Sequence, residues 1–268
     1  MKIGIIGCGY VGQAAALNWK KKNYYISVTT RQPERIATLS NCSDQVCVLK
    51  DQSLTSFIAQ QDALLISVAP DHFSQYESTY LSVAHAVANH VKNNPSLKQI
   101  IYTSSTSVYG DNQGNWVDEN ALIFPQEIHT KILHEAEKIL LNCASEHLKV
   151  CILRLGEIYG PNREIENRLR QRQNQPFPGT GDSYTNLIHL TDIVEALDFA
   201  LTNGLKGIYN LCNDFHILRR IFYHDICQKE QIPPIKWDPQ LRSLHGGNRR
   251  VSNQKIKDKG FIFTYPNY

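Results

Sequence analysis

The chain has 268 residues, enough for one large domain or a domain with a small appendage, and its 42% hydrophobic and 20% charged content is typical of a folded protein. Lys and Arg number 28 against 25 Asp and Glu, so the net charge of +3 is too weak to indicate nucleic acid as a partner. No apolar run approaches the roughly 20 residues of a membrane helix. The seven cysteines are scattered without a Cys-x-x-Cys pair, so we expect no metal site, no disulfide framework and a cytoplasmic location.

Strand-like and helix-like segments alternate along the first two thirds of the chain. We predict strands at Lys2–Ile6, Tyr25–Thr29, Val46–Leu49, Ala63–Val68, Gln99–Thr103, Val150–Arg154 and Gly207–Cys212, and helices at Ala14–Lys22, Pro33–Leu39, Tyr80–Asn93, Gln126–Glu146 and Asp192–Leu201. Strands that alternate with helices pair in parallel through right-handed crossovers. The prediction is therefore an α/β fold with a Rossmann-type, doubly wound parallel sheet.

The remaining segments are polar and lack a clear period. Residues 161–187 are rich in Arg, Gln, Asn and Gly, and the chain from Asn213 onward is basic and irregular. In folds of this class, ligands bind at the carboxyl edge of the sheet, and we expect these segments to form a small cap there. The expected division is a cofactor-binding domain over 1–160 and a cap or substrate region over 161–268, interleaved with the last sheet elements at 186–212.

A glycine-rich turn follows the first predicted strand and opens the first predicted helix. Its sequence is Gly7-Cys8-Gly9-Tyr10-Val11-Gly12. The first glycine permits a tight turn, the second lets a pyrophosphate approach the backbone, and the third lets the helix pack on the strand. The helix amino terminus adds N–H groups and a partial positive charge. We therefore expect Gly7, Gly9, Tyr10, Val11 and Gly12 to bind a dinucleotide.

The end of the second strand bears on which dinucleotide binds. An NAD-binding chain usually carries an Asp or Glu there for the ribose 2′-hydroxyl. This chain has Thr29-Thr30-Arg31 at that place, with Arg35 four residues later. A guanidinium beside hydroxyls suits a 2′-phosphate. We expect Thr30, Arg31 and Arg35 to favour NADP, with NAD as the alternative.

Five further motifs follow in order along the chain. They are Ile100–Gly110 (IIYTSSTSVYG), Trp116–Glu119 (WVDE), Leu153–Pro161 (LRLGEIYGP), Asn186–Asp192 (NLIHLTD) and Gly207–Leu211 (GIYNL). Together they resemble the extended short-chain dehydrogenase/reductase superfamily of the NAD-dependent epimerase/dehydratase type. The end of the chain, with Arg249-Arg250-Val251-Ser252-Asn253, resembles an atypical branch of that superfamily.

The resemblance implies a set of cofactor and catalytic positions. For the cofactor it implies Asp51, Val68, Ala69 and Thr103. Catalysis in the family uses a serine, which falls on Ser105, and a Tyr-x-x-x-Lys pair on the following helix. In the matching register the tyrosine position is His129 and the lysine position is Leu133. The catalytic pair of the family is therefore missing from this chain.

Three explanations of the missing pair remain open. His129 could replace the tyrosine as acid and base, because an imidazole titrates near neutral pH. Tyr109 or Tyr159 could donate the proton instead. Alternatively, the protein binds NADP(H) without conventional catalysis and acts as a sensor or regulator. We expect NADP(H)-dependent oxidoreduction or epimerase/dehydratase-like chemistry on a small polar or sugar-derived substrate, with homodimer formation as an open alternative.

Overall fold

The computed structural model describes residues 1–49, 53–70, 72–91, 94–123, 127–241 and 246–268. Contacts divide the chain into two units. The first comprises Met1–Ser105, Lys131–Arg154 and Ile193–Tyr209, and the second comprises Thr106–Thr130, Leu155–Asp192 and Asn210–Tyr268. Among the described residues, no helix has both the length and the hydropathy required to cross a bilayer.

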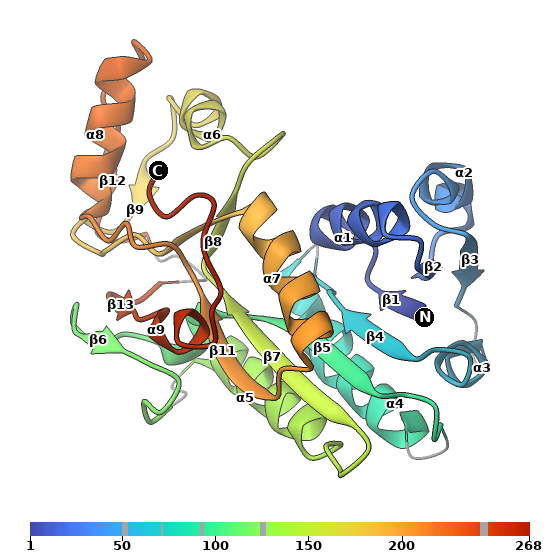
Figure 1. The fold of residues 1–268 in the computed structure, drawn as a ribbon. Coiled ribbons are helices and arrows are strands. Elements are labelled where there is room, and N and C mark those ends of the chain that lie inside the picture. The colour runs from blue at the N-terminus through green and yellow to red at the C-terminus, as the bar shows by residue number, and fades with distance from the viewer. Residues whose placement is uncertain (50–52, 71, 92–93, 124–126, 242–245) are drawn as a thin grey trace. The chain divides into compact units, whose positions relative to one another are not determined.

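A seven-stranded sheet forms the frame of the first unit (Figure 1). Its strands are β1 (Lys2–Ile6), β2 (Tyr25–Thr30), β3 (Gln45–Val48), β4 (Ala63–Ile66), β5 (Gln99–Ser105), β7 (Lys149–Leu155) and β11 (Gly207–Leu211). Their order is β11-β7-β5-β4-β1-β2-β3. Strand β1 pairs in parallel with β2 and β4, β2 with β3, and β4 with β5. The chain therefore builds outward in both directions from β1, which makes the β1–β4 boundary the switch point where doubly wound folds bind ligands.

Helices cover both faces of this sheet. The helical segments are α1 (Tyr10–Lys21), η1 (Pro33–Arg35), α2 (Ile36–Ser40), α3 (Ser53–Ile58), η2 (Phe73–Gln75), η3 (Glu77–Leu81), α4 (Ser82–Val91), α5 (Ile128–Leu141) and α7 (Leu190–Asn203). Helices α1 and α7 lie on one face, and α4 and α5 lie on the other (Figure 1). Burial on both faces explains why the strand at Ala63–Ile66 is an unbroken apolar run.

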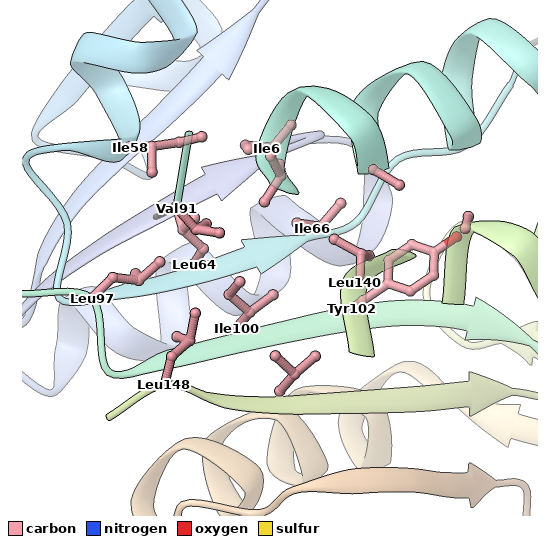
Figure 2. Packing of buried hydrophobic residues seen from close by; sticks show 14 of the residues in the cluster. Ile6, Ile58, Leu64, Ile66, Val91, Leu97, Ile100, Tyr102, Leu140 and Leu148 are labelled. Atoms are coloured by element: carbon pink, nitrogen blue, oxygen red, sulfur yellow. The ribbon is translucent and has the colours of Figure 1, made fainter. Parts of the chain in front are cut away.

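The apolar core of the first unit lies between the sheet and α3, α4 and α5. Figure 2 shows aliphatic side chains from β1, β4 and β5 meeting those of the helices. Ile132 and Ala136 of α5 are buried, whereas Ile128 is 56% exposed. The buried positions of α5 thus belong to the core of a single chain.

The described residues of the second unit form short paired strands, three α-helices and the 3-10 turn η4 (Thr106–Tyr109). The strand pairs are β6 (Trp116–Val117) with β13 (Arg250–Val251), β8 (Glu157–Tyr159) with β10 (Leu187–His189), and β9 (Phe177–Pro178) with β12 (Trp237–Asp238). The helices are α6 (Ile165–Gln171), α8 (Arg219–Lys229) and α9 (Gln254–Lys257). The two-domain division at residue 160 stays a prediction.

Several predicted elements differ from the structure. The segment from Asn213 onward contains the 11-residue helix α8, so the expectation of irregular structure there was wrong. Helix α8 buries one apolar stripe, formed by Phe222, Tyr223, Ile226 and Cys227. The Arg, His and Gln residues on its other faces make the segment polar on average, so the helical period is hard to recognise in the sequence. The predicted helix at Tyr80–Asn93 begins instead with a π-helical turn at Glu77–Leu81, and α4 follows it.

A buried ion pair joins α5 to the sheet. Arg154 of β7 donates from Nη2 to Oε2 of Glu137 at 2.6 Å and from Nε to Oε1 at 3.0 Å. Ser104 of β5 donates to the same Oε1 at 2.6 Å. The Arg154 and Glu137 side chains are each 1% exposed. One carboxylate thus holds two neighbouring strands and the helix that covers them.

We expect Glu137→Gln to destabilise the protein by about 3–5 kcal/mol, because it leaves the Arg154 guanidinium buried without its counter-charge. Urea unfolding monitored by circular dichroism measures the change in the free energy of unfolding. Glu135→Gln is the matched control on the same helix: Glu135 is 56% exposed, and its ion pair with Lys138 spans 3.9 Å. Its effect should stay within about 0.5 kcal/mol, and equal effects of the two variants would contradict the structural role of the pair.

Candidate functional site

The glycine-rich turn follows β1 and lies beside the backbone that follows β4. Gly7 has φ +91°, a backbone conformation that favours glycine. A Cβ atom on Gly7 would collide with the backbone carbonyl of Ser67 and would lie 2.8 Å from the Val68 nitrogen. A side chain at residue 7 is therefore excluded by the backbone that follows β4.

The other two glycines of the turn have different surroundings. A Cβ atom on Gly12 would lie 2.5 Å from the Gly7 carbonyl oxygen, so glycine there lets α1 pack against the turn. A Cβ atom on Gly9 would meet nothing within 4 Å. Gly9 is also the N-cap of α1, which has no side-chain cap and no acidic residue in its first turn. Open space in front of an uncapped helix amino terminus fits a pyrophosphate.

The carboxyl ends of β4 and β5 adjoin this turn. Thr103 of β5 donates from its hydroxyl to the Ser67 hydroxyl at 3.1 Å. Val68 is half-buried and Ala69 is exposed in the segment after β4. Three of the residues implied for cofactor contact therefore lie at or beside the switch point, and the fourth, Asp51, lies outside the described residues.

The end of β2 brings its arginines to the same edge of the sheet. Arg31 is exposed and Thr30 is buried. The Thr30 hydroxyl donates to the Gln32 carbonyl oxygen at 3.2 Å and accepts from the Gln32 backbone N–H at 3.1 Å. Arg35 donates from Nη2 to the Cys8 carbonyl oxygen at 2.8 Å. Burial and the neighbouring Cys42 raise the pKa of the Cys8 thiol to about 12, so this thiol is protonated at neutral pH and is a poor nucleophile.

The residues predicted for the family's catalytic positions fall in both units. Ser105 ends β5 in the first unit and is half-buried. Leu133 on α5, which the sequence register predicts for the position of the family's lysine, is 1% exposed and belongs to the apolar core. His129, in the first turn of α5, is 7% exposed and belongs to the second unit.

Tyr109 already has a partner in the second unit. Its hydroxyl donates to Oδ1 of Asn210 at 2.7 Å, and the side chain is 6% exposed. Asn210 is held in turn by the carboxylate of Glu119, which accepts its backbone N–H at 2.6 Å, and by the Ser252 carbonyl, which accepts from Nδ2 at 3.0 Å. The Tyr109 proton thus sits in an internal network, which weighs against a role as proton donor to a substrate.

Tyr159 is enclosed by aromatic rings of the second unit. Its ring centroid lies 5.0 Å from that of His189 and 5.0 Å from that of Tyr268. Burial raises the pKa of Tyr159 to about 12, and the nearby Asp192 adds to the shift. A phenol with so high a pKa gives up its proton reluctantly at neutral pH.

The arginines of the second unit have internal partners. Glu157 of β8 accepts from Arg168 at 2.5 Å and from Arg219 at 2.9 Å. Burial alone would raise the pKa of Glu157, but the two guanidiniums hold it below its usual value. Arg249 donates to the carbonyl oxygen of Gly110 at 2.7 Å. Arg219 was missed at the sequence level, because its partner lies 62 residues away in the chain and no motif links the two.

The described residues contain no group of three or more His, Cys, Asp or Glu side chains placed to hold a metal ion. The arrangement that remains at the switch point is one of backbone N–H groups, hydroxyls and guanidiniums. Such groups bind anions, and a dinucleotide carries the anionic pyrophosphate that they suit.

Known proteins resemble this chain in sequence and in fold. Residues 3–212 match the model of the NAD dependent epimerase/dehydratase family. Protein YeeZ of Escherichia coli (strain K12) is 28% identical, and the alignment covers 99% of this chain and 96% of that protein.

Two solved structures share the fold. A UDP-glucuronic acid 4-epimerase from Bacillus cereus, in complex with UDP-glucuronic acid and NAD, has a TM-score of 0.81 at 18% identity, with 98% of this chain and 94% of that chain covered. A human epimerase family protein with NADPH has a TM-score of 0.80 at 13% identity, with 100% and 96% covered. The Rossmann-type fold and the resemblance to extended short-chain dehydrogenases/reductases are thereby confirmed. This chain belongs to the NAD-dependent epimerase/dehydratase family.

Proposed function

We propose that the protein is an NADP(H)-dependent oxidoreductase or epimerase/dehydratase-like enzyme acting on a small polar or sugar-derived substrate. The proposal rests on two observations at the switch point. A Cβ atom on Gly9, at the amino terminus of α1, would meet nothing within 4 Å. Strand β2 ends without a carboxylate, and two arginines follow it. A sugar-derived substrate is supported by the shared fold with the Bacillus cereus epimerase, whose structure contains UDP-glucuronic acid.

Each part of the cofactor has a proposed set of partners. Gly7, Gly9, Tyr10, Val11 and Gly12 hold the pyrophosphate through backbone N–H groups. Thr30, Arg31 and Arg35 form the edge of the adenosine site, where the exposed Arg31 guanidinium meets the 2′-phosphate. Val68, Ala69 and Thr103 line the rest of the cofactor.

For catalysis we propose Ser105 and His129. Bound nicotinamide would exchange a hydride with the substrate, Ser105 would orient a substrate oxygen, and His129 would take the place of the family's tyrosine as acid and base. Because Leu133 is apolar, no lysine at that position adjusts the pKa of the donor. Tyr109 is a weaker candidate, since its hydroxyl donates to Asn210.

A non-catalytic NADP(H)-binding regulator is the second candidate. It is favoured by the burial of Leu133 at the lysine position and by the surroundings of the two candidate tyrosines. Under this proposal the cofactor site is kept while the acid and base are lost.

We expect Gly9→Val to abolish NADPH binding while the fold is retained. Gly9 has φ −89°, outside the left-handed region that favours glycine, and the new side chain would fill the space that the pyrophosphate needs. Gly7→Ala is the contrasting variant: its Cβ atom would meet the Ser67 backbone, so we expect a lower melting temperature. Calorimetric titration and thermal unfolding separate the two effects. Full affinity in a folded Gly9→Val protein would contradict the proposed pyrophosphate site.

We expect the native protein to bind NADPH more tightly than NADH, and Arg31→Ala to remove that preference. Loss of a charge-assisted contact with the 2′-phosphate should weaken NADPH binding by about 1.5–3 kcal/mol, roughly tenfold or more, and leave NADH binding unchanged. Fluorescence titration with both cofactors measures the ratio. Equal affinities in the native protein would contradict the NADP assignment.

We expect Ser105→Ala and His129→Phe each to lower turnover by roughly 10²-fold or more, with NADPH affinity unchanged. Oxidation of NADPH is followed with a panel of sugar-derived and small carbonyl substrates. Full activity in His129→Phe would make this histidine structural. If NADPH binds and none of the substrates turns over, the regulator becomes the better-supported function.

A further inference from the structure

Arg31 and Arg35 lie four residues apart but have different surroundings. Arg35 ends η1, is half-buried and donates from Nη2 to the Cys8 carbonyl oxygen at 2.8 Å. Arg31 is exposed, and the part of the chain that the structure describes offers it no hydrogen bond or ion pair. The contact between Arg35 and Cys8 is called the turn clasp below.

The turn clasp fixes the orientation of one peptide plane. In a trans peptide, the carbonyl of one residue and the N–H of the next point in opposite directions, and no cis peptide occurs among the described residues. The hydrogen bond to the Cys8 carbonyl therefore aims the Gly9 N–H away from Arg35. Glycine has the greatest backbone freedom of any residue, so an external hydrogen bond should reduce the motion of the Cys8–Gly9 peptide more than that of a peptide between two larger residues.

Cys8 also has a neighbour at the other end of the α2 segment. Cys8 is 2% exposed, and the nearby Cys42 adds to the rise in the pKa of its thiol. Arg35 precedes α2 and Cys42 follows it. Both ends of the α2 segment therefore lie close to Cys8, and the hydrogen bond from Arg35 is the contact that restrains the Cys8 carbonyl from this segment.

We infer that Arg35 is a positioning residue of the pyrophosphate-binding turn and serves NADPH and NADH alike, whereas discrimination between the two cofactors depends on Arg31. The inference rests on the proposed cofactor site. Both cofactors carry the pyrophosphate, and only NADPH carries the 2′-phosphate. A guanidinium that acts through the turn must therefore affect both cofactors equally, and one that acts on the 2′-phosphate must affect NADPH alone.

Calorimetric titration of both cofactors into Arg35→Ala tests this distinction. Without the charged donor the turn must be ordered by the cofactor itself, so we expect both affinities to fall about tenfold and their ratio to stay at the native value. Arg31→Ala is the matched control, since it removes the same group from the same loop, and it should change the ratio. Arg35→Lys keeps a cationic donor and should recover part of the affinity for both cofactors.

A measurement on the free protein completes the test. The ¹⁵N order parameter of the Gly9 amide should fall in Arg35→Ala and stay native in Arg31→Ala, with thermal unfolding confirming that both variants fold. Loss of NADPH affinity alone in Arg35→Ala, or no change for either cofactor, would overturn the inference. If the native protein binds neither cofactor, the proposed function fails, and the order parameter still decides whether Arg35 restrains the turn.

Discussion

The close approach of two backbones at the switch point constrains the rest of the first unit. The carbonyl after β4 occupies the space that a side chain on Gly7 would need, so residue 7 has to be glycine and the strand ends have to meet there. That contact places the amino terminus of α1 at the carboxyl edge of the sheet. Gly9 in the same turn is exposed, and a Cβ atom on it would meet nothing within 4 Å. The backbone N–H groups at the amino terminus of α1 can therefore bind an anion at this edge even without a charged side chain.

Two groups of ion pairs in the structure differ in burial. In the first unit Glu137 is buried against one guanidinium and one hydroxyl, and this group ties strands to a helix. In the second unit Glu157 pairs with Arg168 and Arg219, whose side chains stay partly exposed. A buried pair is sensitive to the loss of either member, whereas partly exposed pairs are softened by solvent. Loss of one member is therefore expected to cost more stability at Glu137 than at Glu157.

Local patterns in the sequence were enough to predict the strands of the sheet and the glycine-rich turn. Apolar runs and glycine spacing depend only on neighbouring residues, and both are visible in Lys2–Gly12. The sequence did not reveal the contact of Arg35 with Cys8, 27 residues apart, or that of Tyr109 with Asn210, 101 residues apart, because such contacts arise only once the chain has folded. Helix α8 was missed for another reason: its buried stripe is narrow and its other faces are strongly polar. The same limits apply to the catalytic positions. The sequence predicts that the family's Tyr-x-x-x-Lys pair is missing, but it does not reveal the surroundings of His129, Tyr109 or Tyr159.

The buried thiol of Cys8 makes the glycine-rich turn a site that alkylating reagents can report on. A thiol with a pKa of about 12 and 2% exposure reacts with iodoacetamide only when the surrounding structure opens. Cys47 and Cys143 are half-buried and supply faster-reacting internal standards in the same chain. The rate at which Cys8 is labelled, read by mass spectrometry against those two, is therefore a measure of how often the turn opens in the folded protein.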